Sequence, residues 1–313
     1  MFTQPFLARL EAANSVLIAG CGGGFDIYGS VPFIDGLLKA GKRVALASLS
    51  FTPVTRSGGE HVGGALWRID RQSDELPYFP EKWLSEWLAR REIEIPVYAM
   101  ALSGVRPIQA AYEVMIARHD VDLVLLIDGG TDSLIFGDEP GLGTVAEDAV
   151  SILAADAATT GQAIVAALGF GIDHFHGVSH HAFLENAATM IRDSGFLGRL
   201  SLTPGTPEAD AFLDLVAFAN ARQPQGPSIV CNSIASALRG EFGDFHATRR
   251  TKDSELFINP LMLDYWAFAT APLVKRMLFA EKLHTTDTLD EVNALIEQGR
   301  QAITPRPLRP LPL

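Results

Sequence analysis

The sequence predicts an α/β fold, and three observations indicate this class. Short apolar runs alternate along the chain with longer amphipathic segments, as buried strands alternate with helices. The first apolar run, residues 16–19, ends in four glycines at positions 20, 22, 23 and 24, and later runs end in loops that combine glycine with aspartate. Such an alternation is typical of a mainly parallel sheet with right-handed crossovers. We therefore predict a single Rossmann-like three-layer domain over residues 1–313, with a core at about 15–235 and a helical C-terminal extension at about 236–313.

The individual elements follow from local patterns. Strands are expected at residues 16–19, 43–49, 95–101, 122–127, 163–168 and 228–231, with a further strand at 256–258. Helices are expected at residues 32–40, 81–91, 107–119, 145–158, 180–193, 207–220, 261–278 and 289–303. Residues 51–80 contain two glycine pairs, and we expect a long loop there.

Several helix ends carry capping signals. Thr144 with Glu147 and Thr288 with Glu291 have the spacing of a capping box. Thr206 stands before a proline, as an N-cap residue often does. These signals predict where three of the helices begin.

Composition limits the partners and the location. The net charge of −12 opposes binding to nucleic acid or to an anionic membrane, which both attract basic surfaces, so we expect a small-molecule substrate. A homo-oligomer is compatible with the sequence. Two cysteines, Cys21 and Cys231, do not form a zinc framework, and no signal peptide or membrane span is expected. We therefore expect a cytoplasmic protein.

The glycine cluster predicts a ligand loop. It does not fit the dinucleotide pattern G-x-G-x-x-G, because Phe25 or Ile27 would have to be glycine, and Ser30 replaces the lysine of a P-loop. We expect the backbone amides of Gly22, Gly23 and Gly24 to hold a phosphate or another anion, with Asp26 beside them. Binding of NAD or a nucleotide is left open, and a tight turn without a ligand is the alternative.

Aspartates follow three of the predicted strands. Asp26 follows the first strand, Asp128 and Asp132 the fourth, and Asp173 the fifth. Because the carboxyl ends of parallel strands share one edge, we expect these side chains to converge there. Carboxylates brought together favour a divalent cation such as Mg²⁺, Ca²⁺ or Mn²⁺, or the hydroxyl pair of a sugar. The alternative is that each aspartate caps its own loop in an Asx turn.

Further candidate residues surround this group. Asp128 and Asp132 are candidate catalytic carboxylates, and His174 or His176 could move protons near neutral pH. Glu139 and Asn232 are candidate substrate-binding residues in the loops after the fourth and sixth predicted strands. Cys21 could be a thiolate in the glycine loop, although a small buried cysteine is the commoner case.

Four motifs together resemble one family. They are GCGGGFD at residues 20–26, DGGTDS at 128–133, GDEPGLGT at 137–144 with the later Asp148, and GFGID at 169–173. In combination, over residues 15–200, they resemble "domain of unknown function 1152", a family of archaea and bacteria. The resemblance implies a shared fold unit and names no reaction.

Three functions are compatible with these residues. The first is a cytosolic hydrolase or group transferase that acts on a small polar, phosphorylated or nucleotide-like metabolite, assisted by a divalent cation. The second is a nucleotide-binding or NAD-consuming enzyme that uses the same loop without a metal. The third is a metabolite-sensing or assembly subunit without catalysis.

Overall fold

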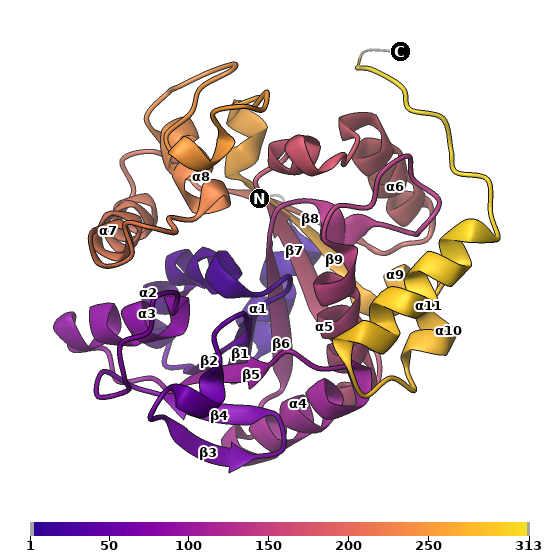
Figure 1. Cartoon of the computed structure of the whole chain (residues 1–313). Coiled ribbons are helices and arrows are strands. Elements are labelled where there is room, and N and C mark those ends of the chain that lie inside the picture. Colours follow the sequence, from indigo (N-terminus) through magenta and orange to yellow (C-terminus); the bar gives the residue numbers. More distant parts are fainter. Residues whose placement is uncertain (1–2, 312–313) are drawn as a thin grey trace.

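A nine-stranded sheet forms the centre of the molecule in the computed structural model, which describes residues 3–311 (Figure 1). Its strands are β1 (Ser15–Gly20), β2 (Arg43–Ser50), β3 (Glu60–Gly63), β4 (Leu66–Ile69), β5 (Val97–Ala101), β6 (Leu123–Gly129), β7 (Ile164–Leu168), β8 (Phe196–Ser201) and β9 (Asp264–Ala269). The order across the sheet is β3-β4-β5-β2-β1-β6-β7-β9-β8. The central strands from β5 to β7 are parallel, and the strands at both edges pair antiparallel.

Helices cover both faces of this sheet. The helices are α1 (Pro5–Ala12), α2 (Val31–Lys39), α3 (Pro80–Arg90), α4 (Val105–His119), α5 (Val145–Ala158), α6 (His180–Arg192), α7 (Pro207–Arg222), α8 (Ile229–Leu238), α9 (Thr270–Val274), α10 (Ala280–Leu283) and α11 (Leu289–Gln301). Short 3-10 turns are η1 (Gly24–Ser30), η2 (Val54–Arg56), η3 (Asp132–Leu134), η4 (Ile172–His176), η5 (Arg249–Thr251) and η6 (Pro260–Leu263). Among residues 3–311, no helix combines the length and the apolar character that crossing a membrane requires.

The buried side chains separate into two layers, one on each face. Along β1, Val16 and Ile18 join the core under α2, α3, α7 and α8, whereas Leu17 and Ala19 join the core under α4, α5, α6 and α11. This alternation is the period of two that a strand imposes on its side chains. The predicted three-layer α/β fold is therefore confirmed.

The connections create a switch point between β1 and β6. From β1 the chain builds outward through β2 to β5, and α4 then carries it across to β6 and on to β7 on the other side. Adjacent parallel strands whose connections leave in opposite directions open a crevice at their carboxyl ends. The residues after β1 and β6 line this crevice.

The structure corrects two predicted elements in the second half of the chain. Residues 228–231, predicted as a strand, begin helix α8, and the Ser228 side chain caps it by accepting a hydrogen bond from the amide of Cys231. Residues 261–278, predicted as one helix, contain β9, which lies between β7 and β8. Short apolar runs fit a strand and a buried helix equally well, and here the sheet neighbours decided. The C-terminal part therefore contributes an inner strand as well as helices.

Smaller differences concern loops and caps. The loop predicted at 51–80 contains the β3-β4 hairpin, and residues 256–258 form only one isolated bridge, between Ile258 and Gly243. The capping box of Thr288 and Glu291 and the N-cap of Thr206 are confirmed. Thr144 does not cap α5, because its hydroxyl bonds to a carboxylate of the site described next.

Candidate functional site

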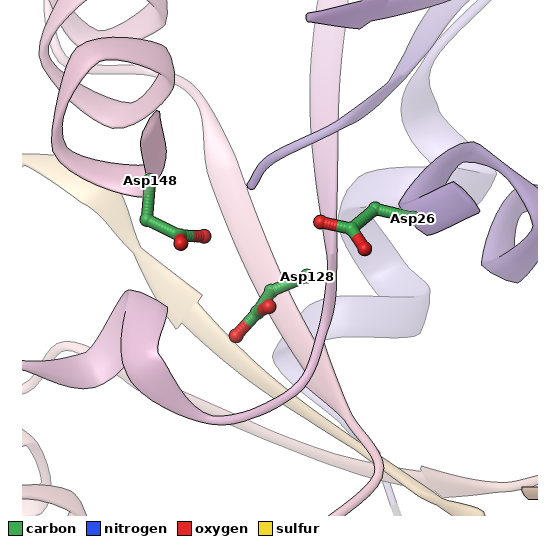
Figure 2. A group of neighbouring side chains, drawn as sticks. All are labelled: Asp26, Asp128 and Asp148. Carbon is green, nitrogen blue, oxygen red and sulfur yellow. The ribbon is translucent and has the colours of Figure 1, made fainter. Parts of the chain in front are cut away.

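Three aspartates converge at the carboxyl edge of the sheet (Figure 2). Asp26, Asp128 and Asp148 each offer a carboxylate oxygen, and these oxygens lie within 4.8 Å of one another. Asp26 belongs to η1 after β1, Asp128 to the end of β6, and Asp148 to the first turn of α5. The three side chains come from different elements, and Figure 2 shows the carboxylates of Asp26 and Asp148 facing each other with that of Asp128 below them.

Two of these carboxylates are oriented by their own loops. Asp26 Oδ2 accepts a hydrogen bond from the amide of Gly22 at 2.8 Å. Asp128 Oδ2 accepts from both the amide, at 3.2 Å, and the hydroxyl of Ser133. Each bond fixes one oxygen of its carboxylate at the strand end.

Asp148 differs from the other two. It is only 1% exposed, yet neither of its carboxylate oxygens has a hydrogen-bond partner among the described residues. A buried polar group without a partner is costly, and a buried charge costs more. Of the three aspartates, Asp148 is therefore the one whose burial no hydrogen bond within the described residues compensates.

Glycines make room for the carboxylates. A Cβ on Gly22 would lie 2.9 Å from an oxygen of Asp148 and 2.9 Å from an oxygen of Asp26, and one on Gly129 would lie 2.4 Å from Asp26. A side chain at either position would fill the space where the carboxylates meet. The glycines after β1 and β6 thus allow the acidic groups to approach.

The glycine loop itself is arranged differently from the expectation. The amide of Gly22 is already bonded to Asp26, and Gly23 and Gly24 have positive φ angles of 95° and 60°. Gly24 packs closely against the hydroxyl of Tyr78, within the space a Cβ would need. Gly22 and Gly23 line the cavity beside the aspartates, whereas Gly24 is not among the lining residues described.

The other two predicted aspartates lie in the same cavity but have partners. Asp132 accepts hydrogen bonds from the amide and hydroxyl of Thr144, both at 2.8 Å. Asp173 accepts one from the amide of Thr131 at 2.6 Å. All four predicted aspartates therefore converge with Asp148, but Asp132 and Asp173 also hold loops together.

The cavity over this group has a volume of about 190 Å³. Its lining includes five aspartates, which we call the acidic floor: Asp26, Asp128, Asp132, Asp148 and Asp173. Its remaining wall includes aromatic, hydroxyl and basic side chains: Phe25, Phe51, Tyr78, Phe175, His176, Ser228 and Arg250. The site thus combines a strongly acidic floor with a basic group on its wall.

Burial and crowding change the acidity of the carboxyl groups. Burial raises the pKa of Asp26, Asp128, Asp148 and Asp173 well above the ordinary value, and repulsion from Asp132 raises each of them further. The pKa of His176 is lowered, chiefly by burial. Shifted pKa values cluster at functional sites, where the surroundings raise the pKa of one group and lower that of another.

Three predicted residues lie elsewhere. Glu139 is bound by the amides of Phe136 and Gly137 in the loop before α5 and is absent from the described wall of the cavity. Asn232 on α8 pairs with Asn220 on α7 at 2.8 Å. His174 lines a separate cavity beside the C-terminal segment, so of the two candidate histidines only His176 faces the aspartates.

Sequence reasoning missed part of the site. Asp148 enters the sequence analysis as part of the motif that follows residues 137–144 but not as a candidate ligand, although its place just after a glycine-rich loop is a usable signal. Tyr78 comes from the irregular segment before α3 and Arg250 from the short turn η5, and neither has a local sequence pattern that marks it. Only the folded chain brings them to the wall of the cavity.

Cys21 is a free, buried thiol whose surroundings disfavour the thiolate. Burial raises its pKa well above the ordinary value, and the nearby Asp148 raises it further. Burial likewise raises the pKa of Cys231 to about 12. We expect neither thiol to react with an aromatic disulfide reagent in the native protein over an hour at pH 8, and both to react after unfolding. Rapid labelling of one thiol without denaturant would contradict this.

Comparison with known proteins identifies a family. No curated protein and no solved structure matches the chain significantly. The family model described as "Protein of unknown function (DUF1152)" matches residues 58–302, well over half of the 313 residues. The matched range includes Asp128, Asp148 and Asp173 and begins after Asp26. The chain therefore belongs to the DUF1152 family.

Proposed function

We propose that this protein is a cytoplasmic hydrolase or group transferase that acts on a small phosphorylated or nucleotide-like metabolite with the help of a divalent cation. One observation carries the proposal. The carboxylate of Asp148 is buried and has no hydrogen-bond partner among the described residues, and it lies close to those of Asp26 and Asp128 beside a cavity at the switch point of the sheet. Ligands of open α/β sheets bind at this place in the fold.

A divalent cation would satisfy this group of carboxylates. Three or more negative charges repel one another, and burial makes each more costly. Oxygen ligands within 4.8 Å of one another suit Mg²⁺, Mn²⁺ or Ca²⁺. Asp26, Asp128 and Asp148 are the proposed ligands, and Asp132 and Asp173 support the loops around them.

The wall of the cavity favours an anionic substrate. Arg250 donates a hydrogen bond to the carbonyl oxygen of Pro227 at 3.0 Å, which holds the guanidinium beside the cavity. A cation on the floor and Arg250 on the wall could bind a phosphoryl group from two sides. Phe51 and Tyr78, with ring centres 6.4 Å apart, offer an apolar border for the rest of a nucleotide-like molecule.

His176 supplies a base for the reaction. Because burial lowers its pKa, its imidazole is neutral at pH 7 and can accept a proton from water or from a substrate hydroxyl. A bound cation would polarise the phosphoryl group and acidify a bound water. Attack by water would give hydrolysis, and attack by a second substrate would give group transfer.

The remaining parts of the proposal follow from composition. The net charge of −12 opposes nucleic acid as the partner. Both cysteines are buried thiols, which fits a reducing cytoplasm.

Thermal unfolding with and without cations tests the proposal. After dialysis against EDTA, we expect saturating Mg²⁺ or Mn²⁺ to raise the Tm by about 5 °C, because a ligand at 100 times its Kd stabilises the folded state by about 2.7 kcal/mol. Nucleotides and sugar phosphates, screened next, should raise the Tm further only when the cation is present.

Three outcomes would contradict the proposal. If no divalent cation changes the Tm and none binds in calorimetry, the metal centre does not exist. If NAD or a nucleotide stabilises the protein equally with and without EDTA, a metal-independent enzyme is the better description. Tight binding of a metabolite with no product over a day would favour a sensor.

A further inference from the structure

Arg306, close to the C-terminal end of the chain, is bound by four side chains. It donates to Asp138 at 2.9 Å, to Glu139 at 2.8 Å, to Glu185 at 2.5 Å and to Asn186 at 2.9 Å. Its own amide also donates to the carbonyl oxygen of Asp138 at 2.6 Å. The neighbouring residues of this segment are exposed, so Arg306 is its anchor point.

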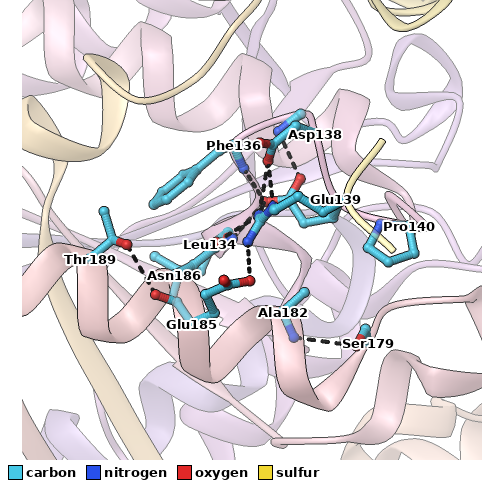
Figure 3. A network of polar contacts seen from close by, with 12 residues as sticks. Leu134, Phe136, Asp138, Glu139, Pro140, Ser179, Ala182, Glu185, Asn186 and Thr189 are labelled. Carbon is cyan, nitrogen blue, oxygen red and sulfur yellow. Dashed lines mark hydrogen bonds and ion pairs between the residues drawn. The ribbon is translucent and has the colours of Figure 1, made fainter. Parts of the chain in front are cut away.

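The partners of Arg306 hold the loop that leads from η3 to α5 (Figure 3). Glu139, which is 2% exposed, accepts hydrogen bonds from the amides of Phe136 at 2.7 Å and Gly137 at 2.8 Å. Asn186 on α6 donates to the carbonyl oxygen of Leu134 at 2.7 Å and to Glu139 at 2.6 Å. Glu139 and Asn186, which both contact Arg306, thus hold the loop at Leu134, Phe136 and Gly137.

The same loop carries the groups that orient the acidic floor. Ser133, next to Leu134, holds Asp128 through its amide and hydroxyl. At the other end of the loop, Thr144 holds Asp132 at 2.8 Å, and α5 with Asp148 begins one residue later. A shift of this loop would therefore disturb the bonds that orient the side chains of Asp128 and Asp132 and the start of the helix that carries Asp148.

Arg306 is well suited to stabilise this loop. A carboxylate as buried as that of Glu139 requires a counter-charge, and the guanidinium of Arg306 provides it in an ion pair of 2.8 Å. Without Arg306 the charge of Glu139 would favour a position closer to water, and the amides bonded to it would follow.

We propose that Arg306 is a positioning residue for the cation site: through Glu139 and Asn186 it fixes the loop between η3 and α5 and so sets the spacing of the aspartates. This inference rests on the proposed function for its link to cation binding. In this role the C-terminal segment, through Arg306, holds the loop between η3 and α5 in place.

Two variants and one matched control test the proposal in the full chain. Arg306→Ala removes all four contacts, and Arg306→Lys keeps the charge but not the fork of donors. The control is Arg222→Ala, which breaks the 2.9 Å pair with Glu86 between α7 and α3; its side chain is 22% exposed, against 25% for Arg306. Both alanine variants should lower the Tm, but only Arg306→Ala removes contacts that hold the loop between η3 and α5.

Cation affinity and hydrogen exchange are then measured well below the Tm. We expect Arg306→Ala to raise the Kd for Mn²⁺ about 10-fold, the lower end of the effect of losing a group bonded to a metal ligand, because Arg306 acts on the ligands only through the loop. Arg306→Lys should give an intermediate Kd. Amides of residues 133–144 should exchange faster in Arg306→Ala. Arg222→Ala should leave both quantities unchanged.

The outcomes separate this inference from the proposed function. If the wild-type protein binds no cation, the proposed function fails, and exchange at residues 133–144 still decides whether Arg306 positions the loop. If exchange there is unchanged in Arg306→Ala, or if Arg222→Ala weakens Mn²⁺ binding equally, the positioning role is overturned.

Discussion

Replacing Asp148 with asparagine is expected to weaken binding of Mg²⁺ or Mn²⁺ by about 100-fold or more, since a direct ligand should matter at least as much as its outer partners. The same substitution should raise the Tm of the metal-free protein. Asp148 is buried, its oxygens have no partner among the described residues, and its charge is repelled by Asp132 and Asp128. Removing that charge relieves the repulsion.

The pH dependence of cation binding should follow from the same carboxylates. Because burial raises the pKa of Asp26, Asp128 and Asp148, protons compete with the cation over a higher pH range than for exposed carboxylates. We expect the affinity to rise with pH as these groups lose their protons. The dependence should be weaker in Asp148→Asn.

Glu147→Gln is the matched control for Asp148→Asn. Glu147 stands next to Asp148 in the same turn of α5 but is not part of the described cavity wall. Calorimetry should show near wild-type affinity for this variant. Equal losses in both variants would indicate a general effect of charge, and full binding by Asp148→Asn would exclude Asp148 as a ligand.

Replacing Glu81 with glutamine is expected to stabilise the protein by about 3 kcal/mol above pH 7, because 1.36 kcal/mol corresponds to each unit of pKa shift. Glu81, in the first turn of α3, is fully buried, and burial raises its pKa from 4.5 to about 7. Neither of its oxygens has a hydrogen bond of normal geometry within the described chain, although the hydroxyls of Ser48 and Ser50 offset part of the burial cost.

The sign follows from proton binding. The folded state holds the proton of Glu81 more tightly than the unfolded state does, so the contribution of Glu81 to stability is fully present below about pH 4.5. It is lost as the pH rises toward about 7 and stays lost above that value. Glutamine at this position does not titrate, so the two proteins should have similar stability at pH 4.5 and differ most at pH 8.

Urea unfolding at several pH values measures this difference. The exposed Glu94→Gln is the control, and it should differ from wild type by less than about 0.5 kcal/mol, as surface substitutions usually do. A constant difference for Glu81→Gln across this range would mean that Glu81 does not titrate near neutral pH in the folded protein.

Much of the fold followed from local patterns. The apolar runs that became β1, β2 and β6 have parallel neighbours on both sides, and those of β5 and β7 have a parallel neighbour on one side. A buried strand of a parallel sheet is typically a short continuous apolar run, which the sequence shows directly. The helix starts at Thr206 and Thr288 depend on hydrogen bonds within four residues. Residues 228–231 and 264–269 could not be assigned in this way, because their apolar runs are short and their structure depends on distant partners.

The sequence alone determined that Asp26, Asp128, Asp132 and Asp173 meet at one edge, because strand direction places every strand end of a parallel sheet there. Only the tertiary structure decided which carboxylates remain without partners. Thr144 and Thr131 reach Asp132 and Asp173 through loop closure, whereas the side-chain oxygens of Asp148 have no hydrogen-bond partner among the described residues. Hydrogen bonds between loops depend on distances of tenths of an ångström between segments far apart in sequence, and no local pattern encodes them.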